Sequence, residues 1–355
     1  MDPRVRRLPI ELTERVFTDP EAALPEVAAR LTSGTADQFY KAKIIHDWIC
    51  DNIAYDAESY FSGKIKPQDY KSVLKNKIAV CAGYSELFLQ MCTLAGVEAI
   101  VISGYSKGFG YRGNMSRESD HAWNAVNINK KWYLFDVTWD AGYLDRKSYI
   151  KNYSTEYLFP DSRAFLYSHL PEKKEHQYYA PALSAEDFQK EPYIRWRFFQ
   201  YGLGLKSDNL KYSNVIDDTF SFEITVNNPG VLLSNSLRTL QQSEVRGASW
   251  QERKGAAITF FYDVPDTGEY EGMVFARWRS EINFQDRVDT GTFENKWLPS
   301  ADLLLEEKKI SRAERDIFDK AYFKVPENNM YYFAEDQFDL PKNNAVLKIH
   351  RTAVI

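Results

Sequence analysis

One stretch of twenty residues, "HAWNAVNINKKWYLFDVTWD" (121–140), constrains the fold more than any other. Apolar and polar residues alternate on both sides of "NINKK", which is typical of two antiparallel strands joined by a tight turn. If the turn has two residues, His121 lies opposite Thr138, and Asp136 becomes a diagonal neighbour on the same face of the sheet. Diagonal Cβ atoms lie about 7 Å apart, so an imidazole–carboxylate hydrogen bond is within reach. A three-residue turn would place the two side chains on opposite faces.

A second constraint is the segment "NKIAVCAGYSELFLQMC" (76–92), in which a cysteine follows a short apolar run. Apolar residues recur at helical spacing from Tyr84 to Ala95, and Gly96 stands where a glycine commonly ends a helix. The helix therefore begins near Cys81. There the helix dipole and free backbone N–H groups favour a thiolate, and the N–H groups can bind a developing oxyanion. The alternative is a buried core thiol, which is the commoner role of a free cysteine.

The other two cysteines, Cys50 and Cys92, lie inside predicted helices, and we expect both to pack in the core. Cys50 belongs to "DQFYKAKIIHDWICDNIAYD" (37–56), where isoleucines and a tryptophan repeat at helical spacing. Three cysteines cannot form a closed disulfide framework, and the chain has no C-x-x-C pair that would indicate zinc. The sequence therefore predicts no metal site.

A thiol nucleophile needs a base, commonly a histidine, and a group that orients it. The chain has five histidines. His46, in a helix, and His350, in the last strand, are interpreted as structural, whereas His169 and His176 lie in a polar connection and are expected at the surface. His121 opens a strand and is the remaining candidate. Its partner Asp136 sits in an aromatic, β-branched setting where an unpaired carboxylate is disfavoured, although a solvated strand-end aspartate is the alternative.

Composition and charge argue against several classes of function. The chain carries 45 Lys and Arg against 50 Asp and Glu, a net charge of −5, and no basic block, so no nucleic-acid interface is expected. No apolar run reaches the roughly 18 residues of a membrane span. The start, "MDPRVRRLPIELTER", lacks the apolar stretch of a signal peptide. The chain as given reads as cytoplasmic; removal of an export signal would make it extracytoplasmic, so the compartment stays open.

The segment "GFGYRG" (108–113) matches the glycine pattern of a dinucleotide site and follows a predicted strand. Such a site also needs a helix that begins at the glycines, so that its N-terminus faces the pyrophosphate. A polar loop and a strand follow instead. We therefore expect a glycine-rich loop and no organic cofactor.

The composition changes near residue 190. From about residue 195, strand signals such as "TFSFEITVNN" and "AAITFFYDV" dominate and predict an all-β sandwich region. The expected division is an N-terminal extension at 1–34, a catalytic domain at 35–190 and a β-rich region at 191–355. A helix capped by Ser300 is also expected near 300–323.

The motifs described so far resemble a known family. "VCAGYSELFLQMCTLAGVEAIVISGYSKG", "DHAWNAVNINKKWYLFDVTWDAG" and "IHDWICDNIAYD" are similar to the transglutaminase-like superfamily, which is related to papain-like thiol enzymes, and especially to its kyphoscoliosis-peptidase branch and bacterial relatives. The similarity covers about residues 35–180. It implies an α+β fold in which the cysteine helix packs on an antiparallel sheet. The β-rich half is similar to the immunoglobulin-like modules that accompany this branch.

Carried over residue by residue, the resemblance implies a catalytic triad. Cys81 would be the nucleophile, His121 the general base and acid, and Asp136 the orienting carboxylate. The family often places an aromatic side chain beside the oxyanion site; Tyr55 is the candidate, while Trp48 fits better in the core. No metal or cofactor is required by this chemistry.

Two classes of function remain open from the sequence. In the first, a thiol acyl-transfer enzyme acts on peptide or glutamine-type amides through a thioester. We expect hydrolysis, as in a cysteine protease, rather than amine crosslinking, because water needs no second substrate site; a glycan amidase would share the triad. In the second, the chain is a non-catalytic scaffold whose β-rich half binds a protein or glycan.

Overall fold

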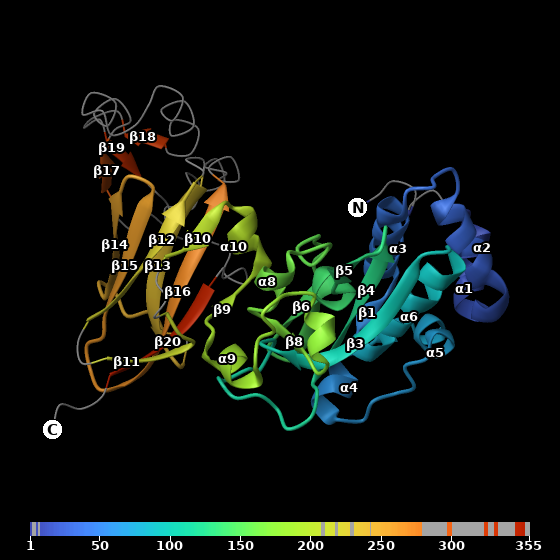
Figure 1. The fold of residues 1–355 in the computed structure, drawn as a ribbon, viewed down its shortest axis with the longest axis horizontal. Coiled ribbons are helices and arrows are strands. Elements are labelled where there is room, and N and C mark those ends of the chain that lie inside the picture. The colour runs from blue at the N-terminus through green and yellow to red at the C-terminus, as the bar shows by residue number, and fades with distance from the viewer. Residues whose placement is uncertain are drawn as a thin grey trace. The chain divides into compact units, whose positions relative to one another are not determined.

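The computed structural model describes residues 1, 5, 8–206, 210–216, 219–227, 231–241 and 243–278, and the strands at 297–299, 323–325, 330–332 and 345–351. The chain forms two compact units, Met1–Gln189 and Lys190–Ile355 (Figure 1). No helix in the described part of the chain has the length and apolar character that crossing a membrane requires.

The first unit begins with helices. They are α1 (Ile10–Thr18), α2 (Pro20–Thr32), α3 (Gln38–Asn52), α4 (Ala57–Ser62), α5 (Tyr70–Asn76) and α6 (Cys81–Leu94). Aspartate side chains accept hydrogen bonds from first-turn amides of α2, α3, α4 and α5, which explains where these helices start. The predicted extension 1–34 contributes to the same core as the later helices, because Val16 and Leu24 are fully buried in it.

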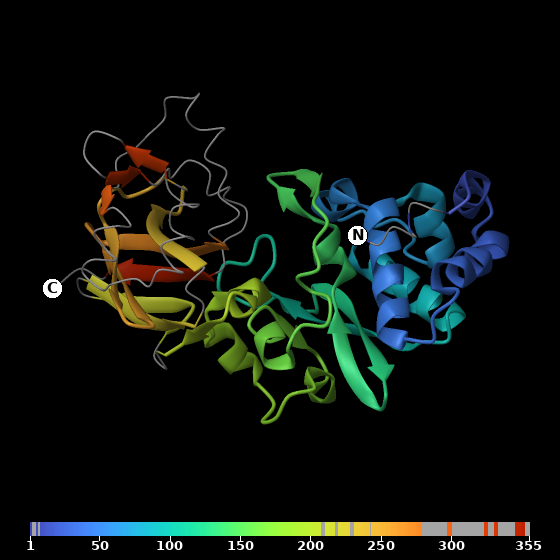
Figure 2. The same ribbon diagram turned by 90° about the horizontal axis from the view of Figure 1, so that it is seen from above.

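A four-stranded sheet, ordered β5-β4-β3-β8, follows the helices. Its strands are β3 (Glu98–Ser106), β4 (His121–Ile128), β5 (Lys131–Phe135) and β8 (His169–Pro171). Helix α6 contacts β3 and β4 as well as α2, α3 and α5 (Figures 1 and 2). The helix that starts at Cys81 is therefore held against the sheet, as the α+β prediction requires.

Shorter elements complete the first unit. They are β1 (Ala54–Tyr55), β2 (Ile78–Ala79), α7 (Val137–Ala141), β6 (Gly142–Asp145), β7 (Ser148–Lys151), α8 (Ser162–Phe165), a 3-10 helix at Lys174–Gln177 and α9 (Ala185–Lys190). The glycine-rich segment 108–113 is irregular and starts no helix, as expected.

The hairpin has the predicted two-residue turn, with Asn129 and Lys130 at φ 55° and 65°. These left-handed values suit the right-handed twist of the paired strands. The register places Asn124 opposite Phe135 and Ile128 opposite Lys131. One prediction was wrong: β5 ends at Phe135, so His121 has no strand partner at Thr138.

The second unit is β-rich. It contains β9 (Tyr193–Ile194), α10 (Trp196–Gln200), β10 (Leu203–Leu205), β11 (Ser213–Ile216), β12 (Thr219–Val226), β13 (Val231–Thr239), β14 (Ser249–Lys254), β15 (Ala257–Asp263), β16 (Gly268–Trp278), β17 (Trp297–Pro299), β18 (Phe323–Val325), β19 (Met330–Tyr332) and β20 (Ala345–Arg351). One sheet is ordered β10-β12-β15-β14 and another β11-β20-β16-β13.

These two sheets form a sandwich. The buried Tyr262 hydroxyl of β15 donates to the carbonyl of Met273 in β16 at 3.0 Å, which joins one sheet to the other. Along β12, buried residues alternate with more exposed ones, as expected of a strand with one face in a core. The helix predicted near 300–323 lies almost wholly outside the described residues.

Candidate active site

Cys81 is the first residue of α6, as the sequence predicted. Val80 precedes it as the N-cap and supplies no side-chain hydrogen bond to the first-turn amides. The backbone N–H of Val80 itself donates to Oε1 of Gln68 at 2.9 Å, which fixes the approach to the cysteine. Cys81 is partly exposed, whereas Cys50 and Cys92 are buried. Burial raises the pKa of the Cys92 thiol, which packs in the core as expected.

The imidazole of His121 and the carboxylate of Asp136 are directly paired. Nε2–H of His121 donates to Oδ2 of Asp136 at 2.7 Å, and both side chains are buried. Asp136 reaches this position as the N-cap of α7, where its Oδ1 accepts from the backbone N–H of Trp139 at 3.1 Å. The two carboxylate oxygens therefore accept from different parts of the chain.

Cys81 completes this arrangement. Its thiol is among the groups that raise the pKa of the His121 imidazole, so the two side chains lie within electrostatic reach of each other. Because Nε2 of His121 is taken by the carboxylate, Nδ1 is the nitrogen left to face the sulfur. The structure thus brings together all three predicted site residues, from a helix start, a strand start and a helix N-cap.

His169 was predicted at the surface, and this prediction was wrong. It is fully buried as the first residue of β8, which pairs with β3. Its Nε2–H donates to the same Asp136 Oδ2 at 3.1 Å, and its Nδ1 accepts from the Ser168 hydroxyl at 2.8 Å. The ring stacks on Phe165 with 3.9 Å between centroids. The polar residues that follow Pro171 suggested exposure, whereas the apolar run Ala164–Tyr167 just before His169 was the available signal for burial.

The two histidines bound to Asp136 have opposite pKa shifts. Burial alone would lower the pKa of His121, but the charge of Asp136, its hydrogen bond and the thiol raise it to about 10. Burial lowers the pKa of His169 to about 4, against the opposing hydrogen bond from Asp136. Burial would raise the pKa of Asp136, yet the two imidazoles hold it below its usual range. The same carboxylate therefore favours the charged form of His121, while burial favours the neutral form of His169.

The same three side chains are spaced closely enough to ligate a metal ion. One ligand atom from each of His121, Asp136 and His169 lies within 4.8 Å of the others. All three are buried, and one carboxylate oxygen already accepts from both rings. The hydrogen bonds give this cluster its order without an ion.

Aromatic side chains surround the site. Trp139 and Trp123 flank the His121 ring at 5.4 Å and 5.8 Å between centroids. Burial is the main cause that raises the pKa of Tyr55, and the charge of Cys81 adds to it, so the Tyr55 hydroxyl lies in the electrostatic environment of the thiol. Trp48 is a core residue, as predicted, and stacks on Phe17.

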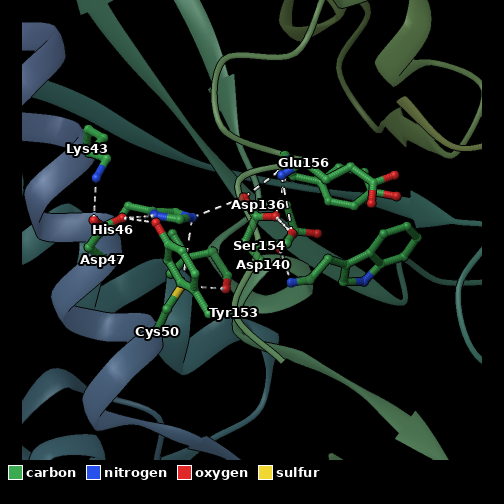
Figure 3. A network of polar contacts seen from close by, with 12 residues as sticks. Lys43, His46, Asp47, Cys50, Asp136, Asp140, Tyr153, Ser154 and Glu156 are labelled. Atoms are coloured by element: carbon green, nitrogen blue, oxygen red, sulfur yellow. Dashed lines mark hydrogen bonds and ion pairs between the residues drawn. The ribbon is translucent and has the colours of Figure 1, made fainter. Parts of the chain in front are cut away.

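A second cysteine–histidine–aspartate group lies between α3 and α7 (Figure 3). Cys50 Sγ is 3.7 Å from Nε2 of His46, and that nitrogen is 3.0 Å from Oδ2 of Asp140. Nδ1 of His46 is 3.1 Å from Oδ1 of Asp47. All four residues are fully buried. The sequence indicated that Cys50 and His46 were structural, and their spacing of four residues in a helix is the signal for their contact; it gave no sign of the contact between His46 and Asp140.

Comparison with known proteins identifies the domains. Residues 25–137 match the model of the family described as "Transglutaminase-like superfamily". Residues 185–288 match the family described as "KY-like, immunoglobulin-like domain". The first match contains Cys81, His121 and Asp136, and it ends within the first turn of α7.

Two similar curated proteins carry the name kyphoscoliosis peptidase. The Homo sapiens protein is 33% identical over 269 residues, which is 74% of this chain and 39% of that protein. The Mus musculus protein is 28% identical over the same length and the same shares. The solved periplasmic domain of TgpA from Pseudomonas aeruginosa aligns with a TM-score of 0.28 and 21% identity, over 39% of this chain and 48% of that one. The chain spans about two-fifths of the length of the two curated relatives.

Proposed function

We propose that this chain, whose residues 25–137 match the transglutaminase-like superfamily and whose residues 185–288 match the KY-like, immunoglobulin-like domain, is a thiol acyl-transfer enzyme. Its substrates would be proteins or peptides, attacked at peptide or glutamine-type amides. The observation that carries the proposal is the buried 2.7 Å pair between His121 and Asp136 beside a thiol at the start of a 14-residue helix.

In the proposed reaction, the Cys81 thiolate attacks the amide carbonyl carbon and forms a tetrahedral oxyanion. First-turn amides of α6 would stabilise that oxyanion. The C–N bond then breaks, and the His121 imidazolium gives its proton to the leaving amine, which leaves a thioester on the sulfur. Asp136 stabilises the imidazolium and fixes the ring.

The thioester is resolved by an acceptor that His121 deprotonates. Water as acceptor releases a carboxylic acid and regenerates the thiolate, whereas a lysine amine gives an isopeptide crosslink. We favour hydrolysis, because it needs no binding site for a second substrate. The chain would then act as a cysteine peptidase or amidase.

The direct test is mass spectrometry of a denatured-protein and peptide library incubated with the protein and a labelled primary amine. New peptide termini identify a peptidase, labelled glutamines a transglutaminase, and glutamate at former glutamines an amidase. Cys81→Ala should remove these products, while Cys92→Ala, which changes a buried thiol elsewhere in the same helix, should retain them if it folds. Equal products from wild type and Cys81→Ala would reject the enzyme.

A second candidate function is binding of a protein or glycan partner by the β-rich unit. Trp250 of β14 is 41% exposed and stacks on Phe261 of β15 with 5.0 Å between centroids, an arrangement suited to contact with a partner surface. If Cys81→Ala preserves every function of the protein while Trp250→Ala abolishes one, this candidate replaces the enzyme.

A further inference from the structure

The buried group around His46 is connected to the candidate active site through the backbone (Figure 3). His46 lies on α3 and contacts one carboxylate on each side, Asp47 at Nδ1 and Asp140 at Nε2. Asp47 belongs to α3 itself. Asp140 belongs to α7, the short helix whose N-cap is Asp136. The contact between His46 and Asp140 therefore joins α3 to the element that carries the catalytic carboxylate, as does the bond from the Cys50 thiol to the carbonyl of Val137.

Asp140 also holds the chain segment that follows β7. Its two carboxylate oxygens accept from the backbone N–H of Tyr157 at 3.1 Å and 3.0 Å, and Oδ1 accepts from the hydroxyl of Ser154. The backbone N–H of Ser154 in turn donates to the carbonyl of Asp140 at 2.8 Å. Segment 154–157 is thereby fixed against α7.

That segment leads back to the active site. The carbonyl of Tyr157 accepts from the backbone N–H of Asp136 at 3.1 Å. The Tyr157 ring meets the edge of Trp139 at 5.1 Å and lies 5.5 Å from the His169 ring, between centroids. A continuous path thus runs from His46 through Asp140 and Tyr157 to the backbone of Asp136.

We propose that His46 and Asp140 are positioning residues that hold the Asp136 carboxylate in place for the thiol–imidazole pair. The inference rests on the proposed function. Its physical basis is that Asp140, a fully buried carboxylate, needs all of its donors. Those donors come from His46 of α3 and from segment 154–157, whose Tyr157 carbonyl accepts from the backbone N–H of Asp136. Removing the charge of Asp140 loosens the N-cap of α7, so that the Asp136 oxygens no longer meet His121 at hydrogen-bond distance.

The test compares two substitutions of the same chemistry on either side of one imidazole. Asp140→Asn weakens the path to Asp136 directly, whereas Asp47→Asn changes a carboxylate that makes no bond to α7 itself and reaches the segment after β7 only through the hydroxyl of Tyr153. The probe is iodoacetamide, with alkylation of Cys81 followed by mass spectrometry at pH 6 and pH 9. Because a displaced carboxylate stabilises the His121 imidazolium less, Asp140→Asn should lower the ratio of the pH 6 rate to the pH 9 rate by about ten-fold, the fold-change that one pKa unit corresponds to. Asp47→Asn should leave the ratio within about two-fold.

Thermal unfolding monitors the structural cost, and both variants are expected to lose stability. If Asp140→Asn does not fold, Ser154→Ala removes one donor to the same carboxylate and should lower the ratio by about three-fold. An unchanged ratio in the folded variants of Asp140 or Ser154, or an equal fall in Asp47→Asn, would overturn the positioning role.

Asp136→Asn separates this inference from the proposed function. If Asp136→Asn lowers the ratio and Asp140→Asn does not, the triad stands and only the positioning role is wrong. If Asp136→Asn also leaves the ratio unchanged, the triad fails, and the positioning role fails with it.

Discussion

The first unit contains two groups of the same chemical composition that differ in what they can do. In one, the thiol of Cys81 acts on the pKa of His121, which is bound to Asp136. In the other, Cys50 contacts His46, which is bound to Asp140. A search for cysteine, histidine and aspartate in proximity would find both.

The two groups differ first in the position of the thiol along its helix. Cys81 begins α6 and is partly exposed, so a substrate carbonyl can reach it beside first-turn amides. Cys50 is near the end of α3, fully buried, and its thiol donates to the carbonyl of Val137 at 3.6 Å. Burial raises the pKa of Cys50, although His46 acts against it. A thiol that lacks both access and an oxyanion site is structural, whatever its neighbours are.

The groups differ also in how charge is balanced. At the candidate active site, one carboxylate is shared by two imidazoles, and only His121 has a raised pKa. In the buried group, two carboxylates share one imidazole, His46. Its pKa, which burial would lower, is raised by the charge of Cys50 and by the hydrogen bonds that His46 donates to Asp140 and Asp47. Because two carboxylates hold the His46 proton, His46 is poorly suited to proton transfer and well suited to joining helices.

The largest expected difference between the two groups is in thiol reactivity. In the native protein at pH 7, iodoacetamide should alkylate Cys81 at least about 100-fold faster than Cys50, because Cys50 reacts only after local opening exposes it. Peptide mass spectrometry over a time course measures both rates in one sample. In denaturant the two rates should converge. Similar native rates would mean that burial does not separate the two thiols.

Local sequence patterns predicted much of the candidate active site. Helical periodicity placed the start of α6 at Cys81, and the turn between alternating strands fixed the register that brings Asp136 beside His121. The end of β5 was missed, because an aspartate that caps a helix was interpreted as part of a strand. An aspartate followed by a short helical turn is a recognisable capping signal.

The remaining contacts could not be predicted from local patterns. His169 reaches Asp136 because β8 pairs with β3, and the two strands are separated by the whole hairpin and α7. Asp140 meets His46 from a helix far along the chain. Periodicity reports which face of an element is buried, but it does not report which distant element covers that face.

A smaller effect is expected in the pH dependence of stability. In the folded protein the pKa of His169 is about 4, whereas in the unfolded chain it is about 6.5. Between these values the unfolded chain binds a proton that the folded protein does not, so stability falls as the pH falls. In the folded protein the pKa of His121 is about 10. Above about pH 6.5, folded His121 therefore keeps a proton that the unfolded chain loses, so stability falls as the pH rises. Stability should therefore peak near pH 6.5 and lose on the order of 3 kcal/mol by pH 4.

Denaturant unfolding from pH 4 to pH 10 measures this curve. His169→Gln should flatten the acid side, because glutamine has no proton to bind, and it should leave the alkaline side in place. His46, whose pKa is also raised, adds to the alkaline loss. A wild-type curve that is flat between pH 4 and pH 6.5 would contradict the neutral state assigned to His169.

The smallest expected effect is a difference in the Cys81 alkylation rate between a substitution at the start of α6 and one just after its end. A Cβ at Gly83 would lie 2.4 Å from Gln68 Oε1 and 2.7 Å from Val73 Cγ2, so Gly83→Ala must displace the glutamine that binds the backbone N–H of Val80. The expected cost is about 1–3 kcal/mol of unfolding free energy. Cys81 alkylation should slow several-fold, because the turn before the thiol shifts.

The control is Gly96→Ala, at φ 71° with open space around it. This substitution strains the other end of the helix by about 1 kcal/mol and should leave the alkylation rate unchanged. Equal slowing in both variants would mean that general loss of helix stability, and not the geometry at Cys81, sets the reactivity of the thiol.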